Sequence, residues 1–574
     1  MKRVLLIFLL GLLAFTSSLS QNEEKLPGVV TGNVSVLWQS YQEDSLIGAI
    51  VPPSKTGFNA YSNLIYTQGN FSAGVRYESY LNSVLGFPGR FSGTGVGYRF
   101  ARYEDRERGI DVTIGNFYEQ FGNGMLFRSY EVRNLGLDNA MDGIRLILSP
   151  IEALRLKIVY GKQRLDFNDG LVNGDGIVRG VNAELSVNEL FDSFKESKLR
   201  VNPEFSFVSR FQEGGYIVRD ELILELPQNV AGWDAGTRLQ YGTWSAGVNY
   251  THKINDPTAD NGYIYKDGKA LTYYLSGNVK KLSFLLHRST SDNMSFRSDR
   301  DLLLFDVPIN NIPAITKPHT YNLAATLYPY ATVINGESSL RGELYYSLPR
   351  GSTLGGKYGT KLSLVYAAAY SPDRIEHPDS IDQLIYGSEL NSWRFGETLN
   401  VQDISFEIDR KFTKNFRAKA MYMNLKFNTL STPVTTDYKG IVDANIAVLE
   451  TQFKTKKRQS LRTEFQVLIT GRDSIDTDGV IEMVKQDKGD WATFVAEYTW
   501  SPHWFVGLQN QYNFGNPEVD KRIHYLFGSA GYINGPHRLG VGYGKRREGI
   551  FCVGGVCRAV PASNGFEVTF TSSF

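Results

Sequence analysis

Several features that define common classes of protein are scarce in this sequence of 574 residues. Two Cys are too few for a disulfide scaffold or for a cysteine-rich metal site. After residue 20, no apolar run approaches the ~18 residues that a membrane-spanning helix requires, and the mean hydropathy is −0.26. Neither sign of charge dominates, because 61 Lys and Arg face 60 Asp and Glu. These scarcities argue against a helical membrane protein and against electrostatic capture of nucleic acid.

Aromatic residues and glycines are plentiful, at 13% aromatic and 56 Gly, and both suit exposed strands joined by tight turns. Between residues 71 and 81, the apolar Val75 and Tyr77 alternate with the polar Arg76 and Glu78. A period of two places one kind of side chain on each face of a strand. The same period recurs at 404–412, 461–469 and 492–500. The pattern therefore predicts many strands, each with one apolar and one polar face.

The first 20 residues have the pattern of an export signal that is removed from the mature protein. Two basic residues precede an apolar stretch from Val4 to Phe15, which is too short to span a membrane as a helix. Small residues follow, and we expect cleavage before Gln21. An uncleaved anchor is the alternative, and it fits the short apolar stretch less well. We therefore expect residues 1–20 to be a signal peptide and residues 21–574 to form one barrel domain.

The connections between the predicted strands alternate between short and long, as in outer-membrane barrels with short periplasmic turns and long extracellular loops. The alternation fails twice, so Asp220–Leu226 and one apparent strand within 320–400 are expected to belong to loops. Because bacterial barrels normally have an even number of strands, we expect an all-β fold, a single large transmembrane antiparallel β-barrel of about 24 strands, with limits of roughly 22 and 26. Closure is required because unpaired backbone groups are not tolerated in lipid. Long connections are predicted at 255–268, 290–319, 372–400, 428–441 and 472–490.

The last ten residues resemble the terminal strand of outer-membrane barrels, which the barrel assembly machinery recognises. Phe566, Val568, Phe570 and Phe574 share one face of this strand. The alternative is a plain edge strand that ends in Phe. The resemblance places the protein in the outer membrane of a Gram-negative bacterium. Its expected partners are outer-membrane lipid, the assembly machinery and other envelope proteins.

The sequence offers little to support catalysis. Its seven His are scattered singly, without the His-x-x-x-His spacing of a metal site. No Gly-x-Ser-x-Gly elbow is present either. We expect no enzymatic activity, no cofactor and no bound metal.

The two cysteines, Cys552 and Cys557, flank the sequence Val-Gly-Gly-Val. If Gly554 and Gly555 form a two-residue turn, the cysteines lie opposite each other at a position where Cα atoms approach closely. That separation is compatible with a disulfide in an oxidising compartment. The alternative is a pair of thiolate ligands for a metal, which lacks further ligands nearby in the sequence.

The segment 115–145 is dense in charges of both signs and contains glycines that permit tight folding. It follows the fifth predicted strand and carries too many charges to face lipid. One interpretation is a loop folded into the lumen near residues 119–138, and the alternative is a solvated outer loop. In the first case we expect four of its residues to line a constriction. These residues are Glu119, Arg128, Glu131 and Arg133.

Two classes of function fit these features. The first is a porin-like channel for small polar solutes, because a barrel of this size has a lumen wide enough for a channel or a plug. The second is a non-transporting scaffold in an outer-membrane secretion or assembly complex, with long loops as docking surfaces. Polar residues of both signs on the predicted inner face argue against strong ion selectivity in the first case.

Two segments resemble a known family. One runs from Gly115 to Arg128 and continues from Asn134 to Gly143, and the other spans Arg547 to Arg558. Both are similar to an uncharacterised family of Bacteroidota outer-membrane proteins, classed as a domain of unknown function. The resemblance implies the fold and the location, but it brings no activity and no catalytic residues.

Overall fold

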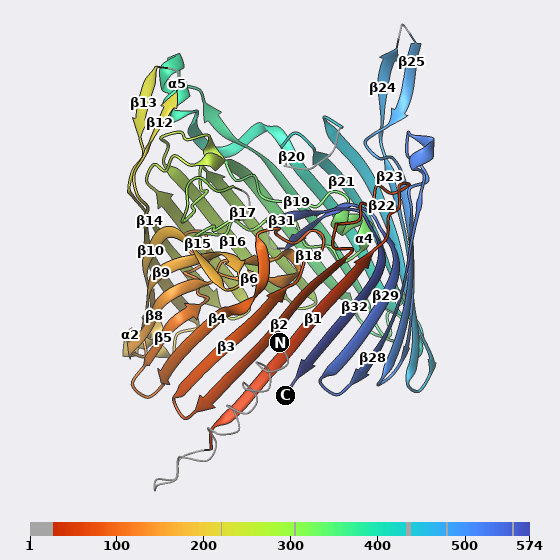
Figure 1. The fold of residues 1–574 in the computed structure, drawn as a ribbon, viewed down its shortest axis with the longest axis horizontal. Coiled ribbons are helices and arrows are strands. Elements are labelled where there is room, and N and C mark those ends of the chain that lie inside the picture. Colours follow the sequence, from red (N-terminus) through yellow and green to blue (C-terminus); the bar gives the residue numbers. More distant parts are fainter. Residues whose placement is uncertain (1–26, 220, 304–305, 432–437, 478–479, 554–555) are drawn as a thin grey trace.

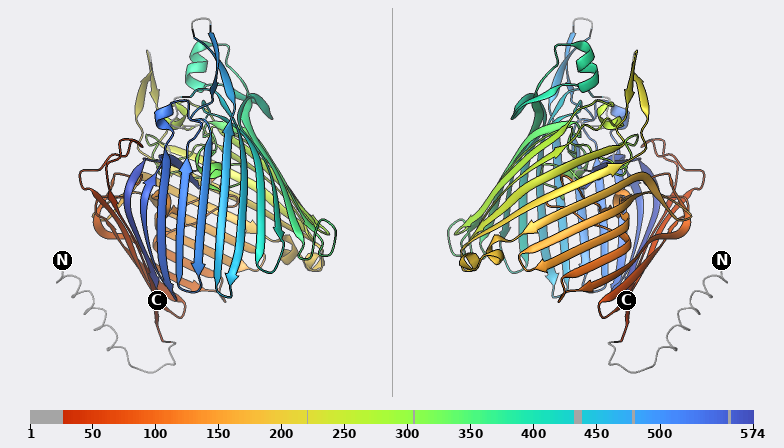
Figure 2. Two further views of the ribbon diagram at one scale, coloured as in Figure 1. Left: turned by 90° about the vertical axis from the view of Figure 1, so that its right-hand side faces the viewer. Right: turned by 90° about the vertical axis from the view of Figure 1, so that its left-hand side faces the viewer.

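The wall of the molecule is a closed antiparallel barrel of 24 strands (Figures 1 and 2). The structure is a computed structural model that describes residues 27–574 except 220, 304–305, 432–437, 478–479 and 554–555. The predicted signal peptide, residues 1–20, lies outside the described residues. The barrel closes because its first strand, Val29–Tyr41, pairs with both the second strand and the last. The prediction of an all-β barrel of this size is confirmed.

The wall strands follow one another around the barrel in chain order. The first twelve are β1 (Val29–Tyr41), β2 (Thr56–Gln68), β3 (Phe71–Tyr80), β4 (Phe91–Asp105), β5 (Ile110–Phe117), β8 (Met141–Ile151), β9 (Leu154–Asn168), β10 (Leu171–Leu185), β11 (Leu199–Phe211), β14 (Asn229–Tyr241), β15 (Trp244–Lys253) and β16 (Gly268–Val279). The other twelve are β17 (Leu282–Asp292), β18 (Gly336–Leu348), β19 (Thr360–Ile375), β20 (Glu389–Lys411), β21 (Phe416–Asn428), β22 (Ile441–Lys456), β23 (Gln459–Thr470), β26 (Trp491–Trp500), β27 (Trp504–Tyr512), β28 (His524–Asn534), β29 (His537–Arg546) and β32 (Ser563–Ser573).

The remaining elements are short and lie in the connections. They are β6 (Glu131–Val132), η2 (Arg133–Leu135), β7 (Leu137–Asp138), α2 (Val187–Leu190), α3 (Asp192–Lys195), β12 (Tyr216–Arg219), β13 (Leu222–Glu225), η3 (Ala259–Asn261), α4 (Asn322–Thr326), α5 (Ser380–Tyr386), β24 (Arg472–Thr477), β25 (Val480–Lys485), η4 (Val519–Lys521), β30 (Gly549–Val553) and β31 (Val556–Val560). Among the residues described, none of the helices has the length and apolar character needed to cross a membrane.

The two segments that interrupted the predicted loop alternation do not belong to the wall. Residues 222–225 form β13, which pairs with β12 in a separate two-stranded hairpin. Residues 320–335 contain α4 and no strand. The wall therefore has the predicted even number of strands.

Two of the predicted long connections are more ordered than the sequence indicated. Strands β19 and β20 continue into 372–400, with pairs from Pro372 with Phe395 to Ile375 with Glu389, through several register shifts. Within 472–490, β24 and β25 pair as a hairpin that projects from the long-loop rim (Figure 1). The extension of β19 and β20 was missed because register shifts interrupt the period of two that marks a regular strand.

The two faces of the wall differ as the alternation predicted. In β3, the ring of Tyr77 is 50% exposed on the outside, whereas its neighbours Arg76 and Glu78 are buried on the inside. Outward apolar side chains recur around the barrel, as on β20 at Ile404 and Phe406. An apolar outer surface with a polar lining is the arrangement of a barrel that stands in lipid.

The last residue of the chain lies at the end of the seam that closes the barrel, in which β32 pairs with β1 from Gly565 to Ser573. Phe574 and Gly32 exchange two backbone hydrogen bonds, with N–O distances of 2.9 and 3.0 Å. A Cβ at Gly32 would lie 2.7 Å from the Phe574 ring, so the absence of a side chain there leaves room for the ring. Phe566, Phe570 and Phe574 are all exposed on the outer face, and Val568 is partly exposed. The recognition of this strand by the assembly machinery stays a prediction.

Deleting Phe574 is expected to lower the amount of protein in the outer-membrane fraction and to increase its degradation. The deletion removes two hydrogen bonds at the end of the closing seam and the terminal aromatic side chain. Fractionation, with heat-modifiable migration on a denaturing gel, measures the change. Phe453→Ala is the control because Phe453 is another exposed aromatic residue of the outer face, far from the terminus. Equal insertion of the deletion variant and the wild type would contradict a role of Phe574 in membrane assembly.

Candidate functional site in the barrel interior

The chain leaves the wall at the end of β5, which is only eight residues long. Beyond that point β4 pairs directly with β9, at Phe91 with Phe167. Residues 118–140, here called the first inner segment, connect β5 to β8 and contact the inner face of the wall. Residues 293–335, the second inner segment, connect β17 to β18. These two connections hold the candidate functional site.

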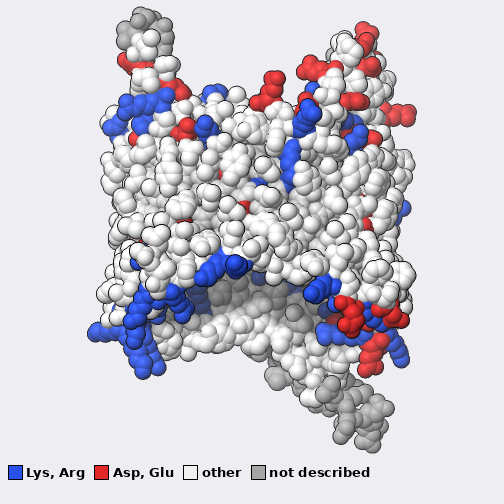
Figure 3. Space-filling model, turned by 180° about the vertical axis from the view of Figure 1, so that it is seen from behind, with Lys and Arg blue, Asp and Glu red and all other residues white. Residues whose placement is uncertain are grey.

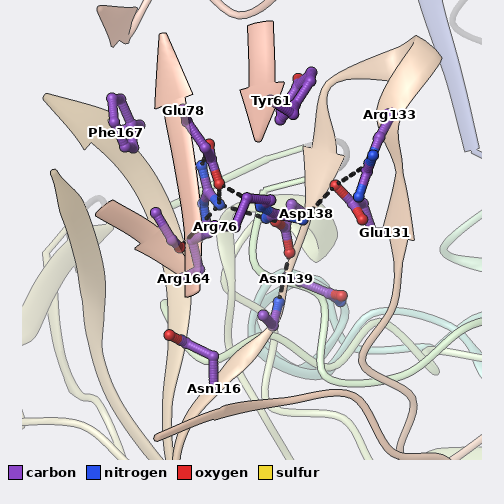
Figure 4. Close-up of polar contacts among 12 residues, drawn as sticks. Tyr61, Arg76, Glu78, Asn116, Glu131, Arg133, Asp138, Asn139, Arg164 and Phe167 are labelled. Atoms are coloured by element: carbon purple, nitrogen blue, oxygen red, sulfur yellow. Dashed lines mark hydrogen bonds and ion pairs between the residues drawn. The ribbon is translucent and has the colours of Figure 1, made fainter. Parts of the chain in front are cut away.

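A buried group of charges joins the first inner segment to the wall (Figure 4). The Arg76 guanidinium lies 2.7 Å from Glu78, 2.9 Å from Glu131 and 2.5 Å from Asp138. Arg164 of β9 lies 2.7 Å from Glu78 and 2.9 Å from Asp138. With Arg133, whose Nε lies 3.0 Å from Glu131, these residues form the ion network: Arg76, Glu78, Glu131, Arg133, Asp138 and Arg164.

The ion network contains three cations and three anions. Arg133 is 38% exposed, and the other five side chains are largely buried, so the balance of charge suits the site because an unpaired buried charge is costly. Tyr hydroxyls complete it: Tyr80 donates to Glu78 at 2.7 Å, and Tyr118 donates to Asp138 at 2.9 Å. Glu131 belongs to the inner segment rather than to a wall strand. Burial raises the pKa of the Glu131 carboxyl, and the adjacent Asp138 acts in the same direction. The network therefore holds the segment through a neutral set of paired charges.

An apolar contact holds the other end of the first inner segment. Phe121, Leu126 and Phe127 are buried against inward-facing valines of four consecutive wall strands. Gly180 and Gly232 leave room on the wall, because a Cβ at these positions would lie 2.8 Å from Phe121 and 2.7 Å from Leu126. The valines are Val159, Val178, Val208 and Val230. The segment is thus held by charges at one end and by apolar packing at the other.

The second inner segment contacts the first and then reaches a different part of the wall. Arg128 N donates to Ile309 O at 2.8 Å, and Asn139 donates to Pro308 O at 2.9 Å. Farther along, His319 Nε2 lies 2.7 Å from Asp403 of β20. Residues around α4 pack on buried apolar side chains of β19 to β23. Together, the two segments bridge β3 and β9 on one side to β20 and β23 on the other.

The four predicted constriction residues do not form a single group. Glu131 and Arg133 belong to the ion network. Glu119 lies 3.5 Å from Arg145 and 3.7 Å from Lys157. The Arg128 guanidinium lies over the ring of Tyr130, at 4.4 Å from its centroid. Whether these residues limit the passage of a solute stays a prediction.

Sequence reasoning missed Arg164 and the whole second inner segment. Arg164 lies 86 residues from its partner Glu78, and no local pattern links them. Residues 290–319 were predicted as a long polar loop, although Ile309 and Ile315 within them are buried. Apolar residues in a loop that was expected to face water were the available signal.

The backbone places the two cysteines opposite each other. Strands β30 and β31 pair with Cys552 opposite Cys557 and Val553 opposite Val556. The turn residues 554–555 and the side chains of 550–558 lie outside what the structure describes. The expected register is therefore present, and the disulfide stays a prediction.

Comparison with known proteins gives the family of this chain, and it also finds solved structures that are similar at low sequence identity. No curated protein matches the sequence. The siderophore receptor PirA of Pseudomonas aeruginosa is similar in structure, with 11% identity, a TM-score of 0.40 and coverage of 95% of this chain and 80% of that one. The outer membrane transporter YddB of Escherichia coli is 8% identical, with a TM-score of 0.41 and coverage of 95% of this chain and 81% of that one. OpdK, an outer membrane protein of Pseudomonas aeruginosa, is 11% identical, with a TM-score of 0.34 and coverage of 77% of this chain and 98% of that one.

A family model matches residues 1–574, the full length of the chain. The chain therefore belongs to DUF6029, a family of unknown function.

Proposed function

We propose that the protein is an outer-membrane channel for small polar solutes whose lumen is narrowed by the two inner segments. The observation that carries the proposal is that both segments pack on the inner face of the wall through buried contacts. A barrel of 24 strands would otherwise enclose a wide lumen. The outward apolar surface supports a position in lipid.

The charges that line the interior support weak selectivity for the sign of a solute. On the wall opposite the ion network, Glu407 pairs with Lys419 at 2.9 Å and Arg462 with Glu450 at 3.1 Å. Paired charges present little net potential to a passing ion. We infer that size and polarity, rather than charge, select the solute, and that residues 120–134 contribute most to the limit on size.

Deleting residues 120–134 tests this function. The deletion removes the apolar contact and Glu131, so single-channel conductance and the uptake of larger solutes are expected to rise several-fold. Insertion should change little, because the segment is not part of the wall. Planar-bilayer recording and liposome swelling measure the two effects. If neither the full-length protein nor the deletion variant conducts, the channel hypothesis fails.

The scaffold function remains as a second candidate because one outer hairpin exposes apolar side chains. Tyr216 and Ile223 of β12 and β13 are each 70% exposed on a hairpin that projects from the long-loop rim (Figure 1). Deleting 216–225 distinguishes the candidates and is the control for the deletion above. A channel should keep its conductance without this hairpin, whereas a scaffold should lose an envelope partner that co-purifies with it.

A further inference from the structure

Positive charge is concentrated in four consecutive short turns of the barrel. These turns join β16 to β17, β18 to β19, β20 to β21 and β22 to β23. Their residues, here called the basic arc, are 279–282, 347–361, 409–417 and 454–458. The basic arc contains thirteen Lys and Arg and a single acidic residue, Asp409.

The other short turns do not share this excess. They carry eight Asp and Glu against six Lys and Arg, in residues 68–71, 104–111, 151–155, 185–199, 241–244, 500–504 and 533–538. Figure 3 views the barrel from behind and shows Lys and Arg following the lower edge of the wall, with mixed charges only at one side. The charge is therefore a feature of one side of the short-turn rim and not of the rim as a whole.

The cations of the basic arc are available for binding. Twelve of the thirteen are exposed, and Arg410 is partly exposed. In the part of the chain that the structure describes, the one ion pair of the arc joins Arg417 to Asp409. A concentration of exposed like charges repels itself and is stabilised by an anionic partner.

Aromatic side chains on the outer face lie next to the arc. Phe412 and Phe453 are 49% and 47% exposed, and Phe416 lies between them at ring distances of 5.6 and 6.4 Å. The Arg410 guanidinium lies over the Phe412 ring at 5.1 Å. Aromatic girdles mark the level of the lipid headgroups on membrane barrels. The cations beside this row are thus at the depth of the headgroup phosphates.

We propose that the basic arc binds anionic phospholipids of the leaflet at the short-turn rim through their headgroup phosphates. The adjacent row of exposed aromatic residues favours a lipid over a soluble acidic protein as the partner. In a bound lipid, the aromatic rings contact the acyl chains and the cations contact the phosphate. Arg and Lys near a membrane surface are attracted to anionic lipid with a free energy that corresponds to about fivefold in affinity per charge. The proposal requires that the barrel stands in a membrane, but it does not require that the barrel conducts.

A pair of four-residue variants tests the lipid site in the full-length protein. The arc variant replaces Lys280, Lys281, Lys456 and Lys457 with Gln. The control variant replaces four exposed cations of other short turns with Gln, namely Arg106, Arg108, Lys195 and Lys198. Each protein is reconstituted in nanodiscs of equal parts phosphatidylcholine and phosphatidylglycerol, and native mass spectrometry counts the lipids that stay bound.

The wild type and the control are expected to retain phosphatidylglycerol in preference to phosphatidylcholine. The arc variant should lose this preference by at least about tenfold, and added salt should weaken it in the wild type. Equal preference in the arc variant and the wild type would overturn the proposal. A second result would also overturn the proposal, namely that the arc variant loses binding to soluble polyglutamate while its lipid preference is unchanged. The partner of the arc would then be a soluble polyanion. Conductance, recorded in parallel, reports on the channel separately.

Discussion

Replacing Asp138 with Asn is expected to release the first inner segment from the wall and to raise the conductance of the barrel. The Asp138 carboxylate belongs to the segment, is only 7% exposed, and accepts hydrogen bonds from Arg76 and Arg164 of the wall and from Tyr118. Asn keeps the shape but removes the negative charge that joins the segment to both wall arginines, which leaves three cations with two anions. Removing one partner of a buried ion pair typically costs ~3–5 kcal/mol. Because about 1.4 kcal/mol is a factor of ten, the open population of the segment should rise at least about a hundredfold.

Hydrogen exchange of residues 118–140 and single-channel recording measure this release. Glu407→Gln is the matched control, because Glu407 also pairs with a cation on the inner face but is about a quarter exposed. Solvent-exposed ion pairs contribute only ~0–1 kcal/mol to stability, so the control substitution should change hydrogen exchange little. Unchanged exchange in Asp138→Asn would show that the ion network does not hold the segment.

The wall was predictable from sequence because its signal is local and repeated. Alternation such as that of Arg76, Tyr77 and Glu78 identifies a strand and both of its faces from a few adjacent residues. The failure of the loop alternation, together with the even strand count that is usual in bacterial barrels, correctly took the strand within Asp220–Leu226 out of the wall. The extension of β20 into 389–400 was missed because the register shifts there break the alternation.

The interior was predictable only in part. The charges and glycines of 115–145 indicated a compact loop, and Arg76 and Glu78 were placed on the inner face. Their partnership with Arg164 and Asp138 depends on the curvature of the wall, which brings β3 and β9 to the same segment. A single sequence contains no local signal for such long-range pairs. Burial of Ile309 in a loop that was expected to be solvated depends on the same closure.

Replacing Phe127 with Ala is expected to release the first inner segment from its apolar contact. The Phe127 side chain is fully buried, with its ring 4.8 Å from that of Phe121. Truncation of a buried Phe typically costs ~3–5 kcal/mol through lost burial and the cavity that remains. The effect should be insensitive to salt because no charge is involved. Phe406→Ala is the control, since Phe406 lies on the outer face and its ring is 40% exposed.

Loss of either contact, the ion network or the apolar packing, is expected to open the whole first inner segment as one unit. Backbone hydrogen bonds from Phe121 N to Phe127 O, at 3.0 Å, and from Ser129 N to Glu119 O, at 2.9 Å, tie its parts together. Phe127→Ala should therefore speed hydrogen exchange at 131–138 as well as at 121–127, and Asp138→Asn should do the same. Because the two sites share no partner, their free-energy effects should add in the double variant. Faster exchange confined to the mutated end would instead show that the two ends open independently, and each would then be a separate restriction on the lumen.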